Sequence, residues 1–307
     1  MKTRLRLLLA TSLIAAAITS GTASGREVLR PTAAKPAVIP FRLEGANIVV
    51  EVELAPGRRL PFVFDSGLAH GNLITPAAAK AWGLKADAGL GVRDAAGIGS
   101  DAALTSVAAI RVGEARLEHP PFAIVPIPDA VTRRPGLPAI AGFLGAPLLA
   151  DAVLCIAYSQ QAMQRWPRGA FDASRMISVP MLLNHGLPTI RISIDGRGAT
   201  MIVDSGNNGA VVVYPSFADT PAFRKRYPQL AAHEGYGGSG HSFEAQTGDA
   251  DVVVIGPGVG FEHVPLTVIP QGMDPAWGID GMVGYEVLSR LNPCLDVEGQ
   301  RLLFVGE

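Results

Sequence analysis

The tripeptide Asp-Ser-Gly occurs twice in this chain, each time directly after a short apolar run. The copies begin at Asp65 and at Asp204, 139 positions apart. A carboxylate at the end of a buried strand, followed by a small hydroxyl residue and glycine, is held in a sharp loop, because glycine permits close approach of the backbone. If two such loops face each other, their carboxyl groups lie within about 3 Å and cannot both ionise. The sequence therefore predicts a pair of aspartates that shares one proton and titrates as a unit.

A carboxyl pair of this kind is suited to hydrolysing an amide bond without a covalent intermediate. The ionised member takes a proton from a water held between the two groups, and the protonated member donates to the carbonyl oxygen. Because the reaction needs one proton on the pair, we expect activity in the acidic range. On this hypothesis Asp65 and Asp204 are catalytic, whereas Ser66 and Ser205 orient the loops by hydrogen bonds. The alternative is that each aspartate only accepts turn hydrogen bonds at the end of its strand.

Two further pairs of landmarks keep the same spacing. Gly145, in Phe-Leu-Gly, and Gly284, in Met-Val-Gly, are 139 positions apart, as are Cys155 and Cys294. Three pairs of landmarks in one register indicate an internal duplication.

The strands expected to position the aspartates are repeated as well. Alternating apolar residues predict a hairpin over 48–54 and 60–64, and a second over 190–194 and 201–203, each leading into Asp-Ser-Gly. The chain has 35 glycines, 24 prolines and only 6% aromatic residues, with valine and isoleucine gathered in short runs. This composition favours an all-β protein with many turns.

Short helices are expected after each Asp-Ser-Gly. Thr75 and Pro76 predict the N-cap and first position of a helix that continues over 77–84, and residues 215–227 are expected to form one helix at the corresponding place. The remaining predictions are strands over 108–112, 122–125, 251–255 and 266–269, loops over 129–141 and 270–280, and a connection between the halves over 166–173.

The N-terminus has the features of an export signal. Residues 1–24 have a basic head, an apolar stretch and small residues at the end, which predicts a cleaved secretory signal rather than an uncleaved anchor. Residues 25–40, rich in proline, alanine and small polar residues, are expected to form a linker or extended arm, or a short propeptide. Two lobes are expected over 41–168 and 169–307.

The formal charge of −1 gives no electrostatic footprint for nucleic acid, and no stable membrane insertion is expected.

With these residues in place, the chain resembles the retropepsin-like and pepsin-like aspartic proteases, over about residues 41–165 and 179–304. The resemblance implies a bilobal acid-protease fold of two duplicated, β-barrel-like lobes with short helices. It implies that a polypeptide substrate binds extended in the cleft, that no cofactor or metal is needed, and that one chain acts as a monomer. It also implies the following residue roles: a catalytic pair of Asp65 and Asp204, and support of their loops by Ser66, Gly67, Ser205, Gly206, Gly145 and Gly284. The sequence departs from the family at Leu68 and Asn207, where a small residue is usual.

The resemblance also suggests flaps over the cleft. The candidate flap residues are Gly97, Ile98, Gly99 and Ser100 in the first half, and Tyr236, Gly237 and Gly238 in the second. Residues 235–240 satisfy a dinucleotide-binding glycine pattern, but no strand precedes and no helix follows them, so a flap or plain loop is the better interpretation. The six histidines show no paired metal-ligand spacing.

Two questions stay open at this point. Cys155 and Cys294, placed by the resemblance in the last strand of each half, form either a disulfide between the lobes or two buried free thiols. The function is either that of an aspartic endopeptidase or that of a catalytically silent peptide-binding or sensor protein on the same scaffold. A structural envelope protein is the third option, and it would not need matched aspartates.

Overall fold

Each Asp-Ser-Gly follows a β-hairpin. In the computed structural model, which describes residues 34–93, 99–236 and 242–305, β3 (Asn47–Ala55) pairs antiparallel with β4 (Arg58–Phe64). In the second half β15 (Leu187–Ile194) pairs in the same way with β16 (Arg197–Val203). Both hairpins confirm the predictions from alternating apolar residues. The ends of β4 and β16 are buried, so each aspartate leaves a strand that is fixed in the core.

The first half forms a ten-stranded sheet. Its order is β6–β7–β10–β5–β11–β4–β3–β8–β9, and β2 also pairs with β3. Two of its pairings, β4 with β11 and β5 with β10, are parallel, whereas β5 and β11 run antiparallel. The other strands of this sheet are β2 (Arg42–Glu44), β5 (Asn72–Ile74), β6 (Ala88–Arg93), β7 (Gly99–Thr105), β8 (Ala109–Val112), β9 (Ala115–Glu118), β10 (Phe122–Ile124) and β11 (Gly142–Leu144).

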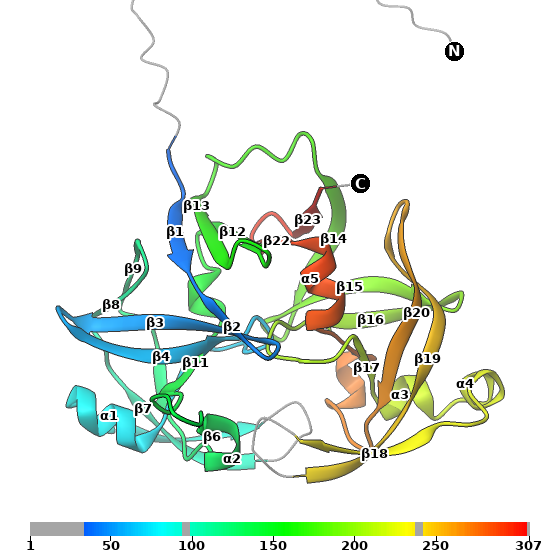
Figure 1. Ribbon diagram of the computed structural model, residues 1–307, viewed down its shortest axis with the longest axis horizontal. Helices are drawn as coiled ribbons and strands as arrows, with labels where there is room; N and C mark the ends of the chain where they lie inside the picture. The colour runs from blue at the N-terminus through cyan, green and yellow to red at the C-terminus, as the bar shows by residue number, and fades with distance from the viewer. Residues whose placement is uncertain (1–33, 94–98, 237–241, 306–307) are drawn as a thin grey trace, which may run out of the picture. The chain divides into compact units, whose positions relative to one another are not determined.

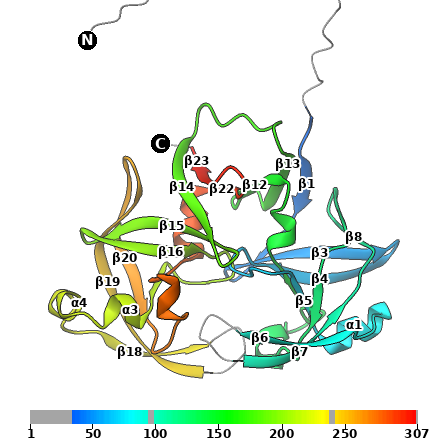
Figure 2. The same cartoon turned by 180° about the vertical axis from the view of Figure 1, so that it is seen from behind.

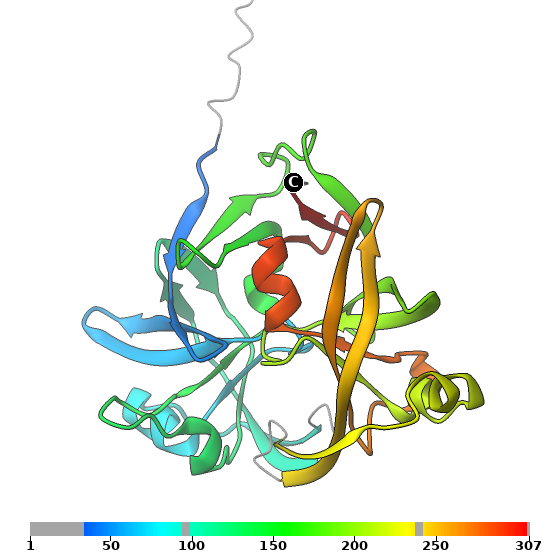
Figure 3. The same cartoon turned by 45° about the vertical axis from the view of Figure 1, so that its right-hand side comes forward.

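The second half repeats this arrangement within a thirteen-stranded sheet. There β16 pairs parallel with β21, β17 parallel with β20, and β17 antiparallel with β21. Figure 3 brings the long β19–β20 hairpin to the front, beside α5. The strands of this part are β14 (Ile177–Asn184), β17 (Val211–Val213), β18 (Ala231–Tyr236), β19 (Ser242–Gly256), β20 (Val259–Val268), β21 (Gly281–Val283), β22 (Cys294–Asp296) and β23 (Arg301–Phe304).

Six neighbouring strands of the larger sheet come from both halves of the chain. In the order β1–β13–β12–β22–β23–β14, the first three belong to the first half and the last three to the second. Figures 1 and 2 show them together in the upper part of the view, above the other strands of the two halves. The remaining bounds are β1 (Ala37–Pro40), β12 (Ala152–Ala157) and β13 (Ala162–Pro167). The arm expected over 25–40 therefore ends as a paired strand, with the Ile39 side chain fully buried.

The helices are short and differ in part from the predictions. Thr75 does cap α1 (Pro76–Trp82), and its side chain accepts a hydrogen bond from the Ala78 N–H. The single helix expected over 215–227 was wrong: two helices form instead. Pro221 starts the second of them, because its ring and missing N–H prevent continuation of the preceding turn. The helical elements are α2 (Asp129–Thr132), η1 (Ala146–Leu148), α3 (Pro215–Ala218), α4 (Pro221–Arg226), η2 (Pro275–Trp277) and α5 (Tyr285–Leu291).

Three smaller expectations need correction. The loop expected over 129–141 begins with α2, and the connection expected over 166–173 begins two residues too early, inside β13. The cysteines lie in β12 and β22, the penultimate strands of their halves, and not in the last ones. They face each other in this antiparallel pair and are joined by a disulfide, which ties the two halves together covalently.

Candidate active site

The two Asp-Ser-Gly loops begin from matching backbone contacts. The Asp65 N–H donates to the Leu144 carbonyl at 2.8 Å, and the Asp204 N–H donates to the Val283 carbonyl at 3.0 Å. Both acceptors precede the glycine of an apolar-apolar-Gly triplet. Each loop is therefore held by the parallel strand beside it, β11 in one half and β21 in the other.

The serines of the two loops bond across to each other. The Ser66 N–H donates to the Ser205 Oγ at 3.0 Å, and the Ser205 N–H donates to the Ser66 Oγ at 2.9 Å. Each hydroxyl also donates to the carbonyl before the opposite aspartate, Val203 for Ser66 at 2.7 Å and Phe64 for Ser205 at 3.2 Å. Both serines are buried, so this set of four hydrogen bonds is shielded from water and fixes the two loops face to face.

The glycines that follow make room for the opposite carboxyl group. A Cβ added at Gly67 would lie 2.7 Å from the Cγ of Asp204, and one added at Gly206 would lie 2.6 Å from the Cγ of Asp65. Within each loop the glycine N–H donates to its own aspartate Oδ1, at 2.8 Å in both cases. No side chain larger than hydrogen fits at either position without moving a carboxyl group.

The two carboxyl groups are in direct contact and share a hydrogen bond. Asp204 is buried and Asp65 is half-buried. Burial is the main cause that raises the pKa of Asp65 well above its ordinary value, and the charge of Asp204 and the hydrogen bond to it add to this. Burial also raises the pKa of Asp204, but the hydrogen bonds from Asp65 and from the Gly206 and Asn207 N–H groups oppose the shift. Burial thus favours one proton shared by the pair.

The distal glycines lie directly under the loops. A Cβ at Gly284 would come to 2.5 Å from the Asn207 carbonyl oxygen, and one at Gly145 would overlap the Leu68 carbonyl oxygen. The residues after these glycines donate to the same carbonyls, Ala146 to Leu68 at 2.9 Å and Tyr285 to Asn207 at 2.8 Å. The triplets therefore support the loops by close backbone packing.

One polar residue of the first half was missed by the sequence reasoning. Asn72 is buried, and its Oδ1 accepts from the Gly145 N–H at 3.0 Å while its Nδ2 donates to the Pro121 carbonyl at 3.1 Å. It joins the distal glycine to the loop before β10. At the position 139 later stands Val211, which cannot do this. No local pattern marks this role, because the Pro121 carbonyl that Asn72 contacts lies 49 positions away.

The flap predictions fall mostly outside the described residues. Gly97, Ile98, Gly237 and Gly238 lie outside them. Gly99 and Ser100 begin β7, and Tyr236 ends β18. β7 pairs with β6 and β18 with β19, so the candidate flap residues of each half adjoin or lie in an antiparallel hairpin.

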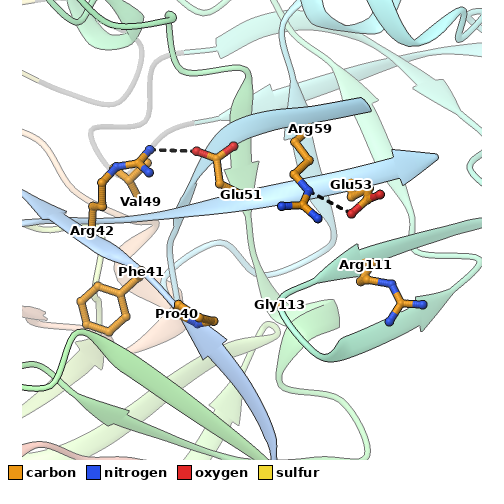
Figure 4. Close-up of a pocket in the computed structure, with 9 residues that line it drawn as sticks. All are labelled: Pro40, Phe41, Arg42, Val49, Glu51, Glu53, Arg59, Arg111 and Gly113. Atoms are coloured by element: carbon orange, nitrogen blue, oxygen red, sulfur yellow. Dashed lines mark hydrogen bonds and ion pairs between the residues drawn. The ribbon is translucent and has the colours of Figure 1, made fainter. Parts of the chain in front are cut away.

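Two pockets are formed by residues of the first half. One, of about 290 Å³, lies over β3 and contains two ion pairs, Arg42 with Glu51 at 2.8 Å and Arg59 with Glu53 at 3.0 Å (Figure 4). None of its lining residues comes from a catalytic loop. The other, of about 570 Å³, includes Ala69 and therefore adjoins the Asp65 loop.

In the described ranges (34–93, 99–236 and 242–305), no helix has the length and apolar character needed to cross a membrane. Nor does any group of three or more His, Cys, Asp and Glu side chains in these ranges offer a metal site.

The fold is therefore an all-β, bilobal fold of the acid-protease type, with the two aspartates at the junction of its halves. Residues 50–148 match the family model described as aspartyl protease. This confirms the resemblance to retropepsin-like and pepsin-like proteases for the segment that contains Asp65 and Gly145. No curated protein matches the chain.

Proposed function

We propose that this protein is an aspartic endopeptidase. The observation that carries the proposal is the hydrogen-bonded pair of Asp65 and Asp204, each packed against the glycine of the opposite loop. Asp204, with its charge stabilised by backbone N–H groups, takes the proton from an attacking water. Asp65, which holds the shared proton, donates to the carbonyl oxygen of the scissile amide. The serine and glycine contacts hold both groups in place during the reaction.

The acidic working range follows from the same geometry. The pair must hold one proton, and the raised pKa of Asp65 keeps that proton bound well above the ordinary range of a carboxyl group. We expect the rate to fall at low pH, where Asp204 is also protonated, and at high pH, where Asp65 loses its proton. We further propose, from the N-terminal sequence, that residues 1–24 are removed on export to the periplasm or beyond and that the mature chain acts as a monomer.

The test uses mature protein and a mixed peptide library, assayed from about pH 3 to pH 7. Cleavage by the wild type, lost in both Asp65→Asn and Asp204→Asn, supports the enzyme. Peptide binding without cleavage by the wild type would instead identify a silent scaffold. Mass spectrometry of the products gives the position of the cleaved bond, which the next experiments need.

A further inference from the structure

The larger pocket lies beside the Asp65 loop. The catalytic loop, η1, the connection between β9 and β10, and β13 all contribute to it, and its lining includes Ala69, His70, Pro121, Ala146, Pro147 and Arg165. Ala69 is four residues from Asp65. The pocket therefore adjoins the loop that carries Asp65.

The pocket is joined rigidly to the catalytic loop. At one end of η1, the Ala146 N–H donates to the Leu68 carbonyl at 2.9 Å. At the other end, Arg165 donates from Nε to the Leu148 carbonyl at 3.0 Å and from Nη2 to the Ala150 carbonyl at 2.5 Å. The short helix thus lies between the loop and Arg165, which fixes the guanidinium relative to the catalytic centre.

Among the residues that the structure describes, Arg165 is a half-buried cation without a paired carboxylate. Its hydrogen bonds go to carbonyl oxygens, and no acidic group of the described chain lies within ion-pair distance of it. Asp151 acts on it only at longer range, and burial lowers its pKa, which shows that the charge is partly desolvated. A desolvated guanidinium is stabilised by an anion, and its planar donors match a carboxylate.

The other polar groups of the pocket come from β9, the Asp65 loop, the connection between β9 and β10, and the turn after η1. Arg116 is paired with Glu118 at 2.5 Å, so these two cancel. His70 and His119 also line the pocket; both are exposed, and their rings offer N–H donors.

We propose that this pocket is a substrate subsite that accepts a carboxylate group of the peptide, with Arg165 and His70 as its specificity-determining residues. The inference rests on the proposed peptidase function and adds a substrate preference to it. The carboxylate is supplied either by an acidic side chain near the scissile bond or by the C-terminus of a short peptide. The pocket of Figure 4 has no such role, because its glutamates already neutralise two of its arginines and no catalytic loop lines it.

The experiment compares matched peptides built on a sequence that the wild type cleaves. Each position within four residues of the scissile bond carries Glu in one peptide and Gln in its partner, and a second set ends in a free or an amidated C-terminus. At about pH 5, we expect kcat/KM to favour the carboxylate about fivefold or more at one position on one side of the bond. The two sets show which source of carboxylate the pocket takes.

Two variants assign the preference to the pocket. His70→Gln should reduce the Glu-to-Gln ratio at that position, and His70→Gln combined with Arg165→Gln should abolish it. His263→Gln, at an exposed histidine outside the pocket, is the matched control and should keep the ratio. If Arg165→Gln does not fold, His70→Gln alone decides. An absent preference in the wild type, or one that survives in His70→Gln and in the folded double variant, overturns the proposal.

Failure of the proposed function gives a different result. If the wild type cleaves no peptide of the library, the same peptide pairs are tested for binding to the Asp65→Asn protein by fluorescence anisotropy. Tighter binding of the carboxylate member, lost with His70→Gln, supports the pocket without the peptidase. Equal binding of both members overturns the pocket as well.

Discussion

The two half-sites share their innermost contacts and differ in what surrounds them. Serine and glycine contacts are matched to within a few tenths of an ångström across the pair. One shell further out, η1 in the first half is a single turn of three residues, while α5 in the second half has seven. Contacts that hold two carboxyl groups together tolerate little variation, whereas the structure next to them is free to differ.

The shorter element leaves space in the first half. Asp151, with a left-handed φ of 54°, ends the turn after η1, and Asn292, with a φ of 45°, caps α5. In the second half the guanidinium of Arg290 lies over the Phe261 ring at 4.1 Å, so that cation is covered by its own chain. At the position 139 earlier stands Asp151, which lines the pocket beside the catalytic loop. We therefore propose that the elements next to the catalytic loops, which differ between the two halves, determine the substrate preference.

The largest effect is expected at the aspartates, where the halves must be equivalent. On the proposed mechanism, Asp65→Asn removes the group that holds the shared proton, and Asp204→Asn removes the charged group that takes a proton from water. Each variant should therefore lower kcat by about 10³-fold or more. The measurement is peptide cleavage at the optimal pH, with circular dichroism to show that each variant is folded. Substantial activity in either variant would show that the two halves do not act as one pair.

The glycines test whether the close contact between the loops is needed on both sides. Gly67→Ala and Gly206→Ala each place a methyl group less than 3 Å from the opposite carboxyl, so both should lower kcat about 100-fold and destabilise the fold by about 2 kcal/mol. Gly209→Ala, in the same loop as Gly206, is the control, because its Cβ would meet only Asn207 at an ordinary 3.5 Å. Equal activity of Gly67→Ala and the control would show that the Asp204 carboxyl does not need the space at Gly67. The two halves would then not be equivalent.

Local patterns in the sequence were enough to predict the inner contacts but not the outer ones. The hairpins before Asp65 and Asp204 follow from alternating apolar residues, and the cap at Thr75 follows from its hydroxyl and Pro76. The lengths of η1 and α5 depend on which residue adopts a left-handed conformation and ends the turn. The presence of an aspartate or an asparagine in the sequence does not by itself predict that conformation. The bridge made by Asn72 depends on a carbonyl 49 positions away, which no local pattern contains.

The disulfide tests how far the halves depend on each other for stability. Cys155→Ala with Cys294→Ala removes a link across 139 positions, and we expect the free energy of unfolding to fall by about 3–5 kcal/mol. Denaturant unfolding measures the loss. Because the cysteines pack in a cluster with Val153 and Leu303 that contains no residue of the aspartate loops, the folded variant should keep its kcat within about twofold. A large loss of kcat in the folded variant would mean that the link also sets the loops.

The smallest expected effect is a pH-dependent change in the stability of the Asp65→Asn variant. It tests whether Asp65, in the first half, holds the proton and Asp204, in the second half, holds the charge. The folded state raises the pKa of Asp65, so this group's contribution to stability is fully present below its unfolded value, about 3.9, and is lost as pH rises through the folded value. Asp65→Asn removes the cost of ionising this buried group. We therefore expect the variant to be more stable than the wild type at pH 7, by about 1.4 kcal/mol for each unit of the shift in pKa, and the difference to vanish near pH 3.

Thermal unfolding across this pH range measures the difference in stability. The control is Asp219→Asn, at an exposed aspartate of the second half, which should show no such gain. A variant that is less stable than the wild type at pH 7 would show that the Asp65 carboxylate is stabilised in the fold, and the charge would then have to be assigned to the first half.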